Sequence, residues 1–271
     1  MPSEVSVIIP THNRKELLIR AIKSVLDQSY QDFEIIVVDD LGVSEDCVDF
    51  DPRIKYFRVK SDGYIAYSRD IGIYKSEGKY IAFLDDDDIW LPGKLEKQIK
   101  KIQIPGTVMC LSGMNTITEV NGIPTPDRIH SKTELHGNLL NMFIMNAHFG
   151  TPTVIARHSV FNKVGTFFVD PQMKVGEDVD MFLRIASSGN VYYDPAPSVN
   201  RLINLLNGDN ISRTVSTTQR TSSYAFRAIQ MAYERLLTYP LPVSSRLLTH
   251  FQILNFQTKI IHDKFKGEWK P

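Results

Sequence analysis

The 271-residue sequence has few cysteines, no long apolar run and no excess of either charge. Its two cysteines, Cys47 and Cys110, cannot form a disulfide framework, and they fit a reducing compartment. No stretch approaches the ~18 apolar residues of a membrane span, and no basic segment followed by an apolar one marks a signal peptide. The 31 basic and 31 acidic side chains balance, whereas a nucleic-acid-binding domain is usually distinctly basic. We therefore expect a cytoplasmic globular protein that does not bind nucleic acid.

Charge is nevertheless unevenly distributed along the chain. From Val215 onward eight Lys and Arg stand against three Asp and Glu, a net charge of +5, so the first 214 residues carry −5. This basic segment predicts peripheral contact with anionic lipid, at the inner face of a membrane, or with a lipid-linked diphosphate. A helical cap packed on the domain, or a homodimer contact, explains the same charge equally well.

Strand-like and helix-like segments alternate over the first hundred residues. Short runs rich in β-branched and aromatic residues have the length of strands, and they occupy residues 5–9, 35–38, 54–59 and 80–84. Apolar residues recur at helical spacing over residues 17–26, and Asn13 and Glu16 are placed to cap that helix reciprocally. The alternation predicts an α/β fold with a Rossmann-like, mostly parallel sheet flanked by helices.

The rest of the chain is less regular. Further helices are predicted over residues 64–76, after Pro92 and over residues 178–187, and further strands over residues 108–111 and 153–156. Residues 121–131 contain two prolines and are predicted to form a loop. Two C-terminal helices are predicted on either side of a break at Pro240 and Pro242.

Four carboxylates, Asp85-Asp86-Asp87-Asp88, directly follow the strand-like residues 80–84. Acidic runs are usually solvated loops, but apolar segments enclose this one on both sides. Ligands of open α/β sheets bind at the carboxyl ends of the strands, where crowded carboxylates either take up protons or bind a cation. Mg²⁺ or Mn²⁺, with substrate phosphates completing its shell, fits better than an all-protein Ca²⁺ site. The run therefore predicts metal–phosphate chemistry.

Polar residues also follow the first two predicted strands. Asp39-Asp40 ends the second strand, and Pro10-Thr11-His12-Asn13 ends the first. Alone, Asp39 is as readily explained as a turn or cap residue. Together with the acidic run, these residues are expected to line one crevice at the edge of the sheet.

Ordered segments over the first ninety residues resemble the inverting glycosyltransferases of family 2, which have the GT-A fold. They are Val5-Ser-Val-Ile-Ile-Pro-Thr-His-Asn13, Ala21-Ile-Lys-Ser-Val-Leu-Asp-Gln-Ser-Tyr30, Glu34-Ile-Ile-Val-Val-Asp-Asp40, Ser68-Arg-Asp-Ile-Gly72 and Gly78-Lys-Tyr-Ile-Ala-Phe-Leu-Asp-Asp-Asp-Asp-Ile-Trp-Leu-Pro92. The likeness thins beyond Leu95, although Gly176-Glu-Asp-Val-Asp-Met-Phe-Leu-Arg184 is similar to the family's Glu-Asp motif. Two departures are Leu41-Gly42, where the family usually has Gly-Ser, and Asn207, where members often carry a His.

The resemblance implies a role for each matching residue. Asp40 would pair with the nucleotide base, with Pro10, Thr11 and Asn13 beside it. Asp85 and Asp86 would contact the donor, Asp86 near the ribose, and Asp87 would bind Mn²⁺ or Mg²⁺. Arg69 would face the donor, and Asp178 would be the general base. Glu177 and Asp180 compete with Asp178, but helical geometry turns Asp180 away from it.

The resemblance also implies an activity and a domain organisation. Residues 1–105 would bind the nucleotide sugar, residues 106–214 would form the acceptor half of the same domain, and residues 215–271 would form a helical extension. The donor would be of UDP or dTDP type, and the acceptor a saccharide or lipid-linked saccharide in polysaccharide or glycoconjugate synthesis. His148 and Trp90 could line the sugar sites, or could be packed structural residues. A metal-dependent nucleotidyltransferase and a sugar-nucleotide-binding scaffold without turnover are the alternatives.

Overall fold

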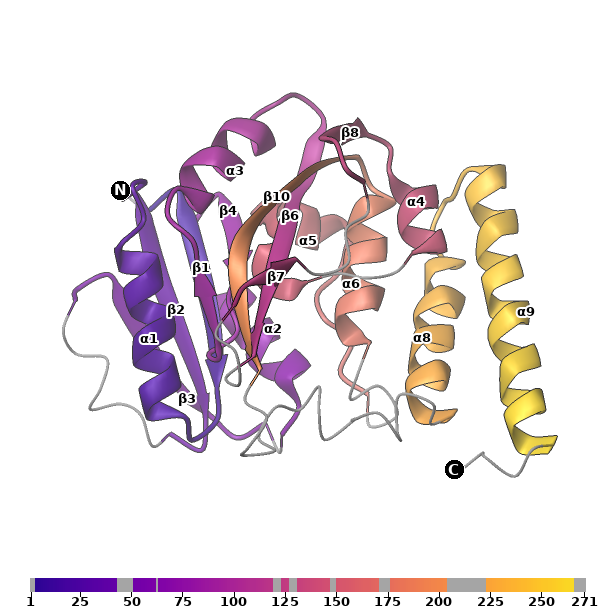
Figure 1. Ribbon diagram of the computed structural model, residues 1–271, viewed down its shortest axis with the longest axis horizontal. Coiled ribbons are helices and arrows are strands. Elements are labelled where there is room, and N and C mark those ends of the chain that lie inside the picture. The colour runs from indigo at the N-terminus through magenta and orange to yellow at the C-terminus, as the bar shows by residue number, and fades with distance from the viewer. Residues whose placement is uncertain are drawn as a thin grey trace.

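The computed structural model describes residues 3–42, 51–61, 63–118, 123–126, 131–146, 150–170, 176–203 and 223–265. Their strands form one ten-stranded sheet with helices packed on both faces (Figure 1). The strands are β1 (Val5–Thr11), β2 (Phe33–Asp40), β3 (Ile54–Val59), β4 (Tyr80–Phe83), β5 (Asp88–Trp90), β6 (Thr107–Thr118), β7 (Thr125–Pro126), β8 (Leu135–Gly137), β9 (Ile155–Arg157) and β10 (Asn190–Ile203). The helices are α1 (Lys15–Leu26), α2 (Ile65–Lys75), α3 (Lys94–Ile102), α4 (Leu140–Met145), the 3-10 helix η2 (Thr151–Thr153), α5 (His158–Val164), α6 (Glu177–Ala186), α8 (Ser223–Leu236) and α9 (Val243–Phe265).

The sheet has a parallel half and a mixed half. Its strand order is β3-β2-β1-β4-β9-β6-β10-β5, with β7 pairing with β6 and β8 with β10. The first four strands in this order are parallel. β9 runs antiparallel to both its neighbours, β10 is parallel to β6, and β5 is antiparallel to β10. The predicted α/β fold, a sheet flanked by helices, is confirmed.

Alternate side chains of β1 enter two different cores. Val5, Val7 and Ile9 pack with α1 and α3 on one face of the sheet, whereas Ile8 packs with α2, α5 and α6 on the other. Because helices cover both faces, the parallel strands are apolar almost throughout. On the α2 face Gly72 allows close approach, since a Cβ there would lie 2.3 Å from Cγ2 of Ile8.

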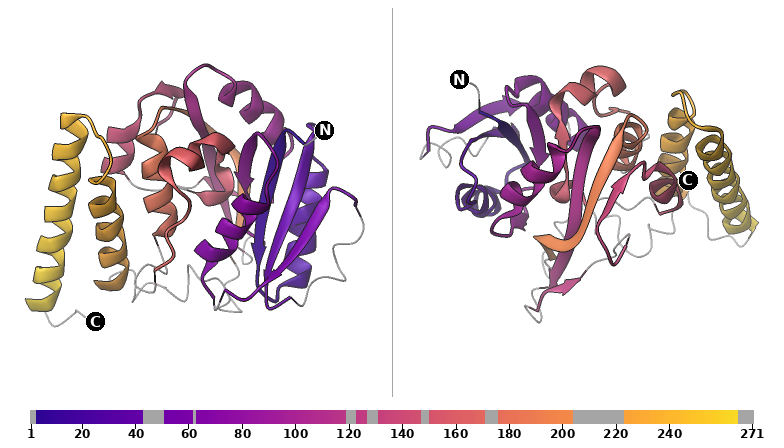
Figure 2. Two further views of the ribbon diagram at one scale, coloured as in Figure 1. Left: turned by 180° about the vertical axis from the view of Figure 1, so that it is seen from behind. Right: turned by 90° about the horizontal axis from the view of Figure 1, so that it is seen from above.

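The C-terminal helices lie at the opposite end of the molecule from β3 (Figures 1 and 2). α8 packs against α6, and α9 packs against α8 and α4. The Tyr233 hydroxyl of α8 donates a 2.7 Å hydrogen bond to the carbonyl of Ile144 in α4. The two helices predicted around Pro240 and Pro242 are thereby confirmed.

Two local predictions are wrong. Asn13 does not cap α1: the N-cap residue is Arg14, no side chain caps the helix, and Asn13 has a positive φ of 52°. β10, a 14-residue strand, was not predicted, because Pro195 and Pro197 interrupt its pattern. The chain accommodates them with register shifts against β6, between Asp194 and Asn200.

None of the described helices is long and apolar enough to cross a membrane.

Candidate functional site

A cleft of about 300 Å³ opens where β1 and β2 end. Strand ends and the following loops supply its walls, since parallel strands direct their carboxyl ends to the same edge. It is lined by Pro10, Thr11, His12, Arg14, Asp40, Ser61, Gly63, Ile65, Ser68 and Asp86. Residues that the sequence separates by more than seventy positions therefore share one wall.

Asp40 faces this cleft, whereas its neighbour Asp39 does not line it. Asp39 accepts a 2.8 Å hydrogen bond from the Tyr56 hydroxyl and is fully buried. Asp40 accepts hydrogen bonds from the backbone N–H groups of Ser61, at 2.6 Å, and Gly63, at 3.1 Å. Burial alone would raise the pKa of Asp40, but these hydrogen bonds outweigh it and the pKa is lowered. Asp40 is therefore ionised at neutral pH and also holds the turn that closes the cleft.

The acidic run after β4 borders the cleft, and Arg14 forms ion pairs with two of its carboxylates. Asp86 accepts a 2.7 Å hydrogen bond from the Thr11 hydroxyl, and burial raises its pKa. The Arg14 guanidinium lies between Asp86, at 3.2 Å, and Asp87, at 3.3 Å. Burial, and next the charges of Asp85 and Asp86, raise the pKa of Asp87 to about 7. The raised pKa values show that these crowded carboxylates favour the uptake of a proton or of a cation.

Arg69 connects the acidic run to α6. Its guanidinium is 3% exposed and forms ion pairs of 2.8 Å with Asp85 and with Glu177. Burial disfavours the charged form, but the charges of Asp85 and Glu177 raise the Arg69 pKa above its ordinary value. The two acidic motifs, about ninety residues apart in sequence, thus meet across one buried arginine.

Asp178 and Asp180 have different surroundings in the first turn of α6. Asp178 is partly exposed, and its charge acts on both Arg69 and Glu177. Asp180 is fully buried and accepts hydrogen bonds from Arg184, at 2.6 Å, and Arg235, at 3.0 Å. The structure therefore separates the two side chains, as helical geometry predicts.

The predicted site residues divide into those that line the cleft and those that do not. Pro10, Thr11, Asp40 and Asp86 line it. Asp85, Asp87 and Asp178 do not line it. Asp87 forms an ion pair with Arg14, Asp85 forms one with Arg69, and the charge of Asp178 acts on Arg69. Asn13 is exposed and outside the lining, and Arg69 is a buried link rather than a lining residue.

Sequence reasoning missed Arg14, Ser61 and Ser68 as lining residues. Arg14 follows the strand-end motif directly, so its position was the available signal. Trp90 is 2% exposed and donates to the Pro152 carbonyl at 3.0 Å, so it is a packed residue. His148 and Asn207 lie outside the described residues.

The carboxylates near Arg14 have the chemistry of a divalent-cation site. Among the residues that the structure describes, no three His, Cys, Asp or Glu side chains converge closely enough to hold a metal ion unaided. An ion that also binds substrate phosphates needs only one or two protein carboxylates. Asp86 and Asp87 supply oxygen ligands, and the guanidinium between them marks a position that attracts a cation. This donor set fits Mg²⁺ or Mn²⁺ held jointly with a diphosphate.

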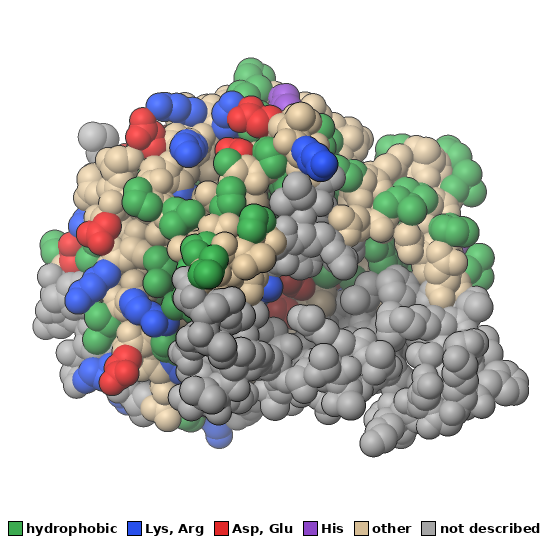
Figure 3. Space-filling view, viewed as in Figure 1, with side chains coloured by type: hydrophobic (Ala, Val, Ile, Leu, Met, Phe, Trp, Pro, Cys, Tyr) green, Lys and Arg blue, Asp and Glu red, His purple; other side chains and the backbone are tan. Residues whose placement is uncertain are grey.

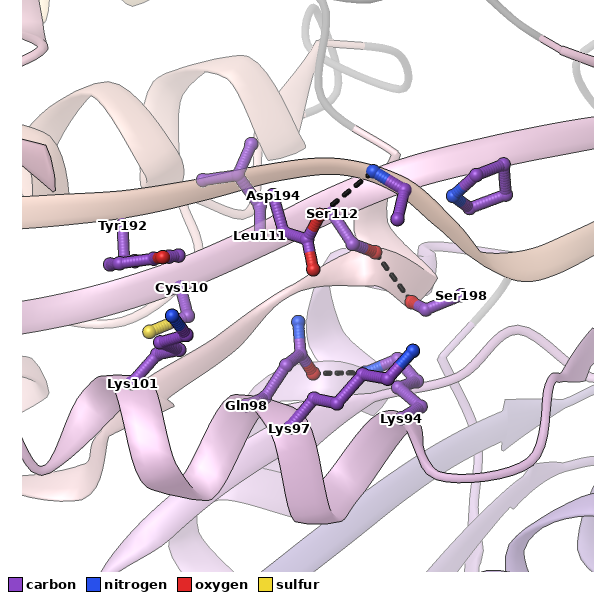
Figure 4. A pocket seen from close by; sticks show the side chains of 12 residues that line it. Lys94, Lys97, Gln98, Lys101, Cys110, Leu111, Ser112, Tyr192, Asp194 and Ser198 are labelled. Atoms are coloured by element: carbon purple, nitrogen blue, oxygen red, sulfur yellow. Dashed lines mark hydrogen bonds between the residues drawn. The ribbon is translucent and has the colours of Figure 1, made fainter. Parts of the chain in front are cut away.

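A second cavity, of about 20 Å³, lies between α3 and the strands β6 and β10 (Figure 4). It has room for about one water molecule. Lys94 lies in its wall, 1% exposed, donates to Oε1 of Gln98 at 2.5 Å, and lies over the Trp90 ring. Burial lowers the pKa of Lys94 to about 7. This cavity is a structural feature of the α3 packing and shares no residue with the cleft.

Comparisons with known proteins give the relatives of this chain. Residues 6–165 match the family described as "Glycosyl transferase family 2". An uncharacterized glycosyltransferase of Rickettsia conorii is 34% identical over 195 residues, covering 70% of this chain and 31% of the relative. The Bacillus subtilis protein TuaG, assigned by name to teichuronic acid biosynthesis, is 26% identical over 195 residues, covering 70% of this chain and 74% of TuaG.

A crystal structure of Staphylococcus aureus TarS residues 1–349 in complex with UDP-GlcNAc has the same fold. The TM-score is 0.73 at 18% identity, covering 97% of this chain and 73% of that one. The chain spans between a quarter and a third of the length of the first Rickettsia relatives that it matches.

Proposed function

The chain belongs to glycosyltransferase family 2, and we propose that it transfers a sugar from a nucleoside diphosphate sugar of UDP or dTDP type to a hydroxyl acceptor. One observation carries this proposal. The Arg69 ion pairs bring the acidic run and the Glu-Asp pair together beside a cleft that ends in a buried, ionised carboxylate. The TarS complex with UDP-GlcNAc supports a sugar nucleotide donor. The assignment of TuaG by name to teichuronic acid biosynthesis supports a saccharide or lipid-linked saccharide acceptor.

Different residues of the cleft bind different parts of the donor. In the proposed complex Asp40, with Pro10 and Thr11, receives the base, and Asp86 receives the ribose. Asp87 would hold Mn²⁺ or Mg²⁺, which when bound offsets the negative charge that develops on the departing diphosphate. Arg69 keeps Asp85 and Glu177 in place and therefore positions both motifs, rather than contacting the donor itself.

Asp178 is the proposed general base. It accepts the proton of the acceptor hydroxyl while the hydroxyl oxygen bonds to the anomeric carbon. The bond from that carbon to the diphosphate breaks with both electrons leaving on oxygen, so a nucleoside diphosphate is released and the configuration inverts. The positive charge that builds on the sugar ring resembles that in glycoside hydrolysis, with the acceptor in place of water.

Product analysis distinguishes this reaction from its alternatives. Incubation with UDP- and dTDP-sugars, Mn²⁺ and a pool of saccharide and lipid-diphosphate acceptors is expected to release nucleoside diphosphate. Free pyrophosphate in its place would identify a nucleotidyltransferase, and donor binding without any release would identify a scaffold.

The same assay tests whether the reaction needs a divalent metal ion. Asp87→Ala, or EDTA added to the unchanged protein, is expected to abolish release, and Mn²⁺ should restore it only to the EDTA-treated protein. Far-UV circular dichroism of Asp87→Ala serves as the folding control. Full activity in EDTA would show that the reaction needs no metal.

The C-terminal segment has one proposed partner, an anionic membrane surface at the inner face of the membrane. This contact is not needed for the chemistry above.

A further inference from the structure

The outward face of α9 carries a continuous row of large apolar side chains. Val243, Leu247, Phe251 and Leu254 are 76%, 66%, 53% and 60% exposed. Their spacing of four, four and three residues places them on one face of the helix. We call these four residues the outer stripe. α9 is the outermost element at its end of the molecule (Figures 1 and 2), and hydrophobic side chains gather over its upper half (Figure 3).

The opposite face of α9 packs on the protein and mixes polar with apolar side chains, since Leu248 also packs against the core. Ser245 and Thr249 are buried there at 2% and 0% exposure, followed by Ile253. The Ser245 hydroxyl donates to Oδ1 of Asn141 in α4 at 2.6 Å, and the Thr249 hydroxyl donates to the Ser245 carbonyl at 2.7 Å. The contact with Asn141 and the burial of Thr249 and Ile253 fix the rotation of the helix, so the outer stripe cannot turn inward. A surface helix normally directs its apolar side chains to the core, whereas α9 also carries a row of them on its outer face.

Charge favours an anionic partner. The segment from Val215 carries +5, and α9 itself contains three Lys and Arg against one Asp. Arg246 and His250 are exposed on the same helix as the outer stripe. Basic residues beside an apolar helical face are typical of helices that lie in the interface of a membrane with anionic lipids.

Area and charge together disfavour a second copy of the chain. Four partly exposed side chains offer a few hundred Å², whereas a stable protein interface buries about 800 Å² on each partner. Two copies joined along α9 would also bring their basic segments together, and like charges across an interface oppose association.

We propose that the outer stripe of α9 is a docking surface for the headgroup region of an anionic lipid bilayer. The stripe enters the boundary between headgroups and acyl chains, and the exposed Arg246 beside it meets lipid phosphates. The docking surface is separate from the cleft and does not depend on the reaction proposed for it.

Vesicle flotation of the full chain tests this docking surface. The variant pair Leu247→Gln/Phe251→Gln removes the two central side chains, and Tyr74→Gln, at a side chain 80% exposed on α2, is the matched control. Vesicles of phosphatidylcholine, with or without a share of phosphatidylglycerol, are used at low and at physiological salt. Thermal melting and light scattering of each protein report on folding and on oligomeric state.

The unchanged protein and Tyr74→Gln are expected to float with the phosphatidylglycerol vesicles, more completely at low salt, and not with phosphatidylcholine alone. Each apolar side chain that the bilayer no longer buries should weaken partitioning of the protein into the vesicles roughly tenfold. The double variant should therefore bind the vesicles roughly a hundredfold less tightly, at an unchanged melting temperature. No flotation of the unchanged protein at low salt would overturn the proposal, as would equal flotation of the double variant. A dimer that the double variant loses, without any flotation, would identify a second copy as the partner instead.

Discussion

At the scale of single residues, the first turn of α6 places two carboxylates in opposite environments. Asp178 is partly exposed beside Arg69 and Glu177, while Asp180 is buried between two guanidinium groups. A general base needs access to the acceptor hydroxyl, and a buried ion-pair partner lacks that access. We therefore propose the reactive role for Asp178 and the structural role for Asp180.

Asp178→Asn is expected to lose at least ~100-fold in turnover, because removal of a general base typically costs ~10²–10⁴-fold. Donor affinity should be nearly unchanged, since the base acts on the acceptor. Steady-state kinetics and donor titration measure the two effects separately. Asp27→Asn, the same change at an exposed carboxylate at the end of α1, is the control. If Asp178→Asn turns over at the control rate, Asp178 is not the base.

Asp180→Asn is expected to act on stability instead. The change leaves Arg184 and Arg235 without their shared carboxylate, and breaking a buried ion pair costs on the order of 3 kcal/mol. Urea unfolding should show a lower midpoint for Asp180→Asn than for Asp178→Asn. The folded fraction of Asp180→Asn should keep most of its turnover. A catalytically dead Asp180→Asn with an unchanged midpoint would reverse the two assignments.

Residue identities in the cleft were predictable only where a strand end fixed them. Asp40 and Asp86 follow buried strands, so the direction of the strand already places them at the sheet edge. Asn13 could not be placed correctly, because a short polar residue can either cap a helix or take a positive φ, and here Arg14 occupies the N-cap position. The link made by Arg69 was beyond prediction, since it depends on α2 and α6, which are distant in sequence, coming together at the Arg69–Glu177 ion pair, and no local pattern encodes that.

At the scale of secondary-structure elements, α3 carries a lysine that is buried without a carboxylate partner among the described residues. Burial lowers the pKa of Lys94 from 10.5 to about 7. Between these values the unfolded chain binds more protons than the folded chain, so the contribution of Lys94 to the free energy of unfolding rises with pH over this range.

Lys94→Met should remove that dependence. The free energy of unfolding should rise less steeply with pH for the variant than for the unchanged protein, by on the order of 1 kcal/mol per pH unit between pH ~7 and ~10. Urea unfolding at several pH values measures it, and Lys97→Met, at an exposed lysine on the same helix, should follow the unchanged protein. Parallel curves for the unchanged protein and Lys94→Met would show that Lys94 stays charged in the fold.

Strands were predictable where β-branched and aromatic residues cluster, and unpredictable where pairing overrides propensity. β1 and β4 are buried runs rich in such residues, and the partly exposed edge strand β3 still contains Ile54, Tyr56 and Phe57, so each was found from its sequence alone. β10 contains two prolines that a central strand normally excludes. It nevertheless runs alongside β6, with a register shift at each proline-containing stretch, which only the paired structure reveals.

At the scale of the whole molecule, one sheet and one set of ion pairs join segments from the entire chain. β5, which begins at the last carboxylate of the acidic run, pairs with β10 from the second half of the chain. Arg235 of the C-terminal extension reaches Asp180 in α6 and lies 3.7 Å from the centre of the Phe168 ring. The expected division into a donor half, an acceptor half and a C-terminal extension, with boundaries at residues 105 and 214, stays a prediction. The fold joins these three segments closely.

The central proposal is that the cleft at the ends of β1 and β2 binds a nucleoside diphosphate sugar through Asp40. Calorimetric titration of UDP, dTDP and their sugars in the presence of Mn²⁺, into the unchanged protein and Asp40→Asn, tests it most directly. One nucleotide is expected to bind the unchanged protein at a single site. Asp40→Asn should weaken it at least ~10-fold, because a hydrogen bond to a charged group is worth about 1.5–3 kcal/mol. Absence of binding by every nucleoside diphosphate, or equal affinity for both proteins, would contradict the proposed donor site.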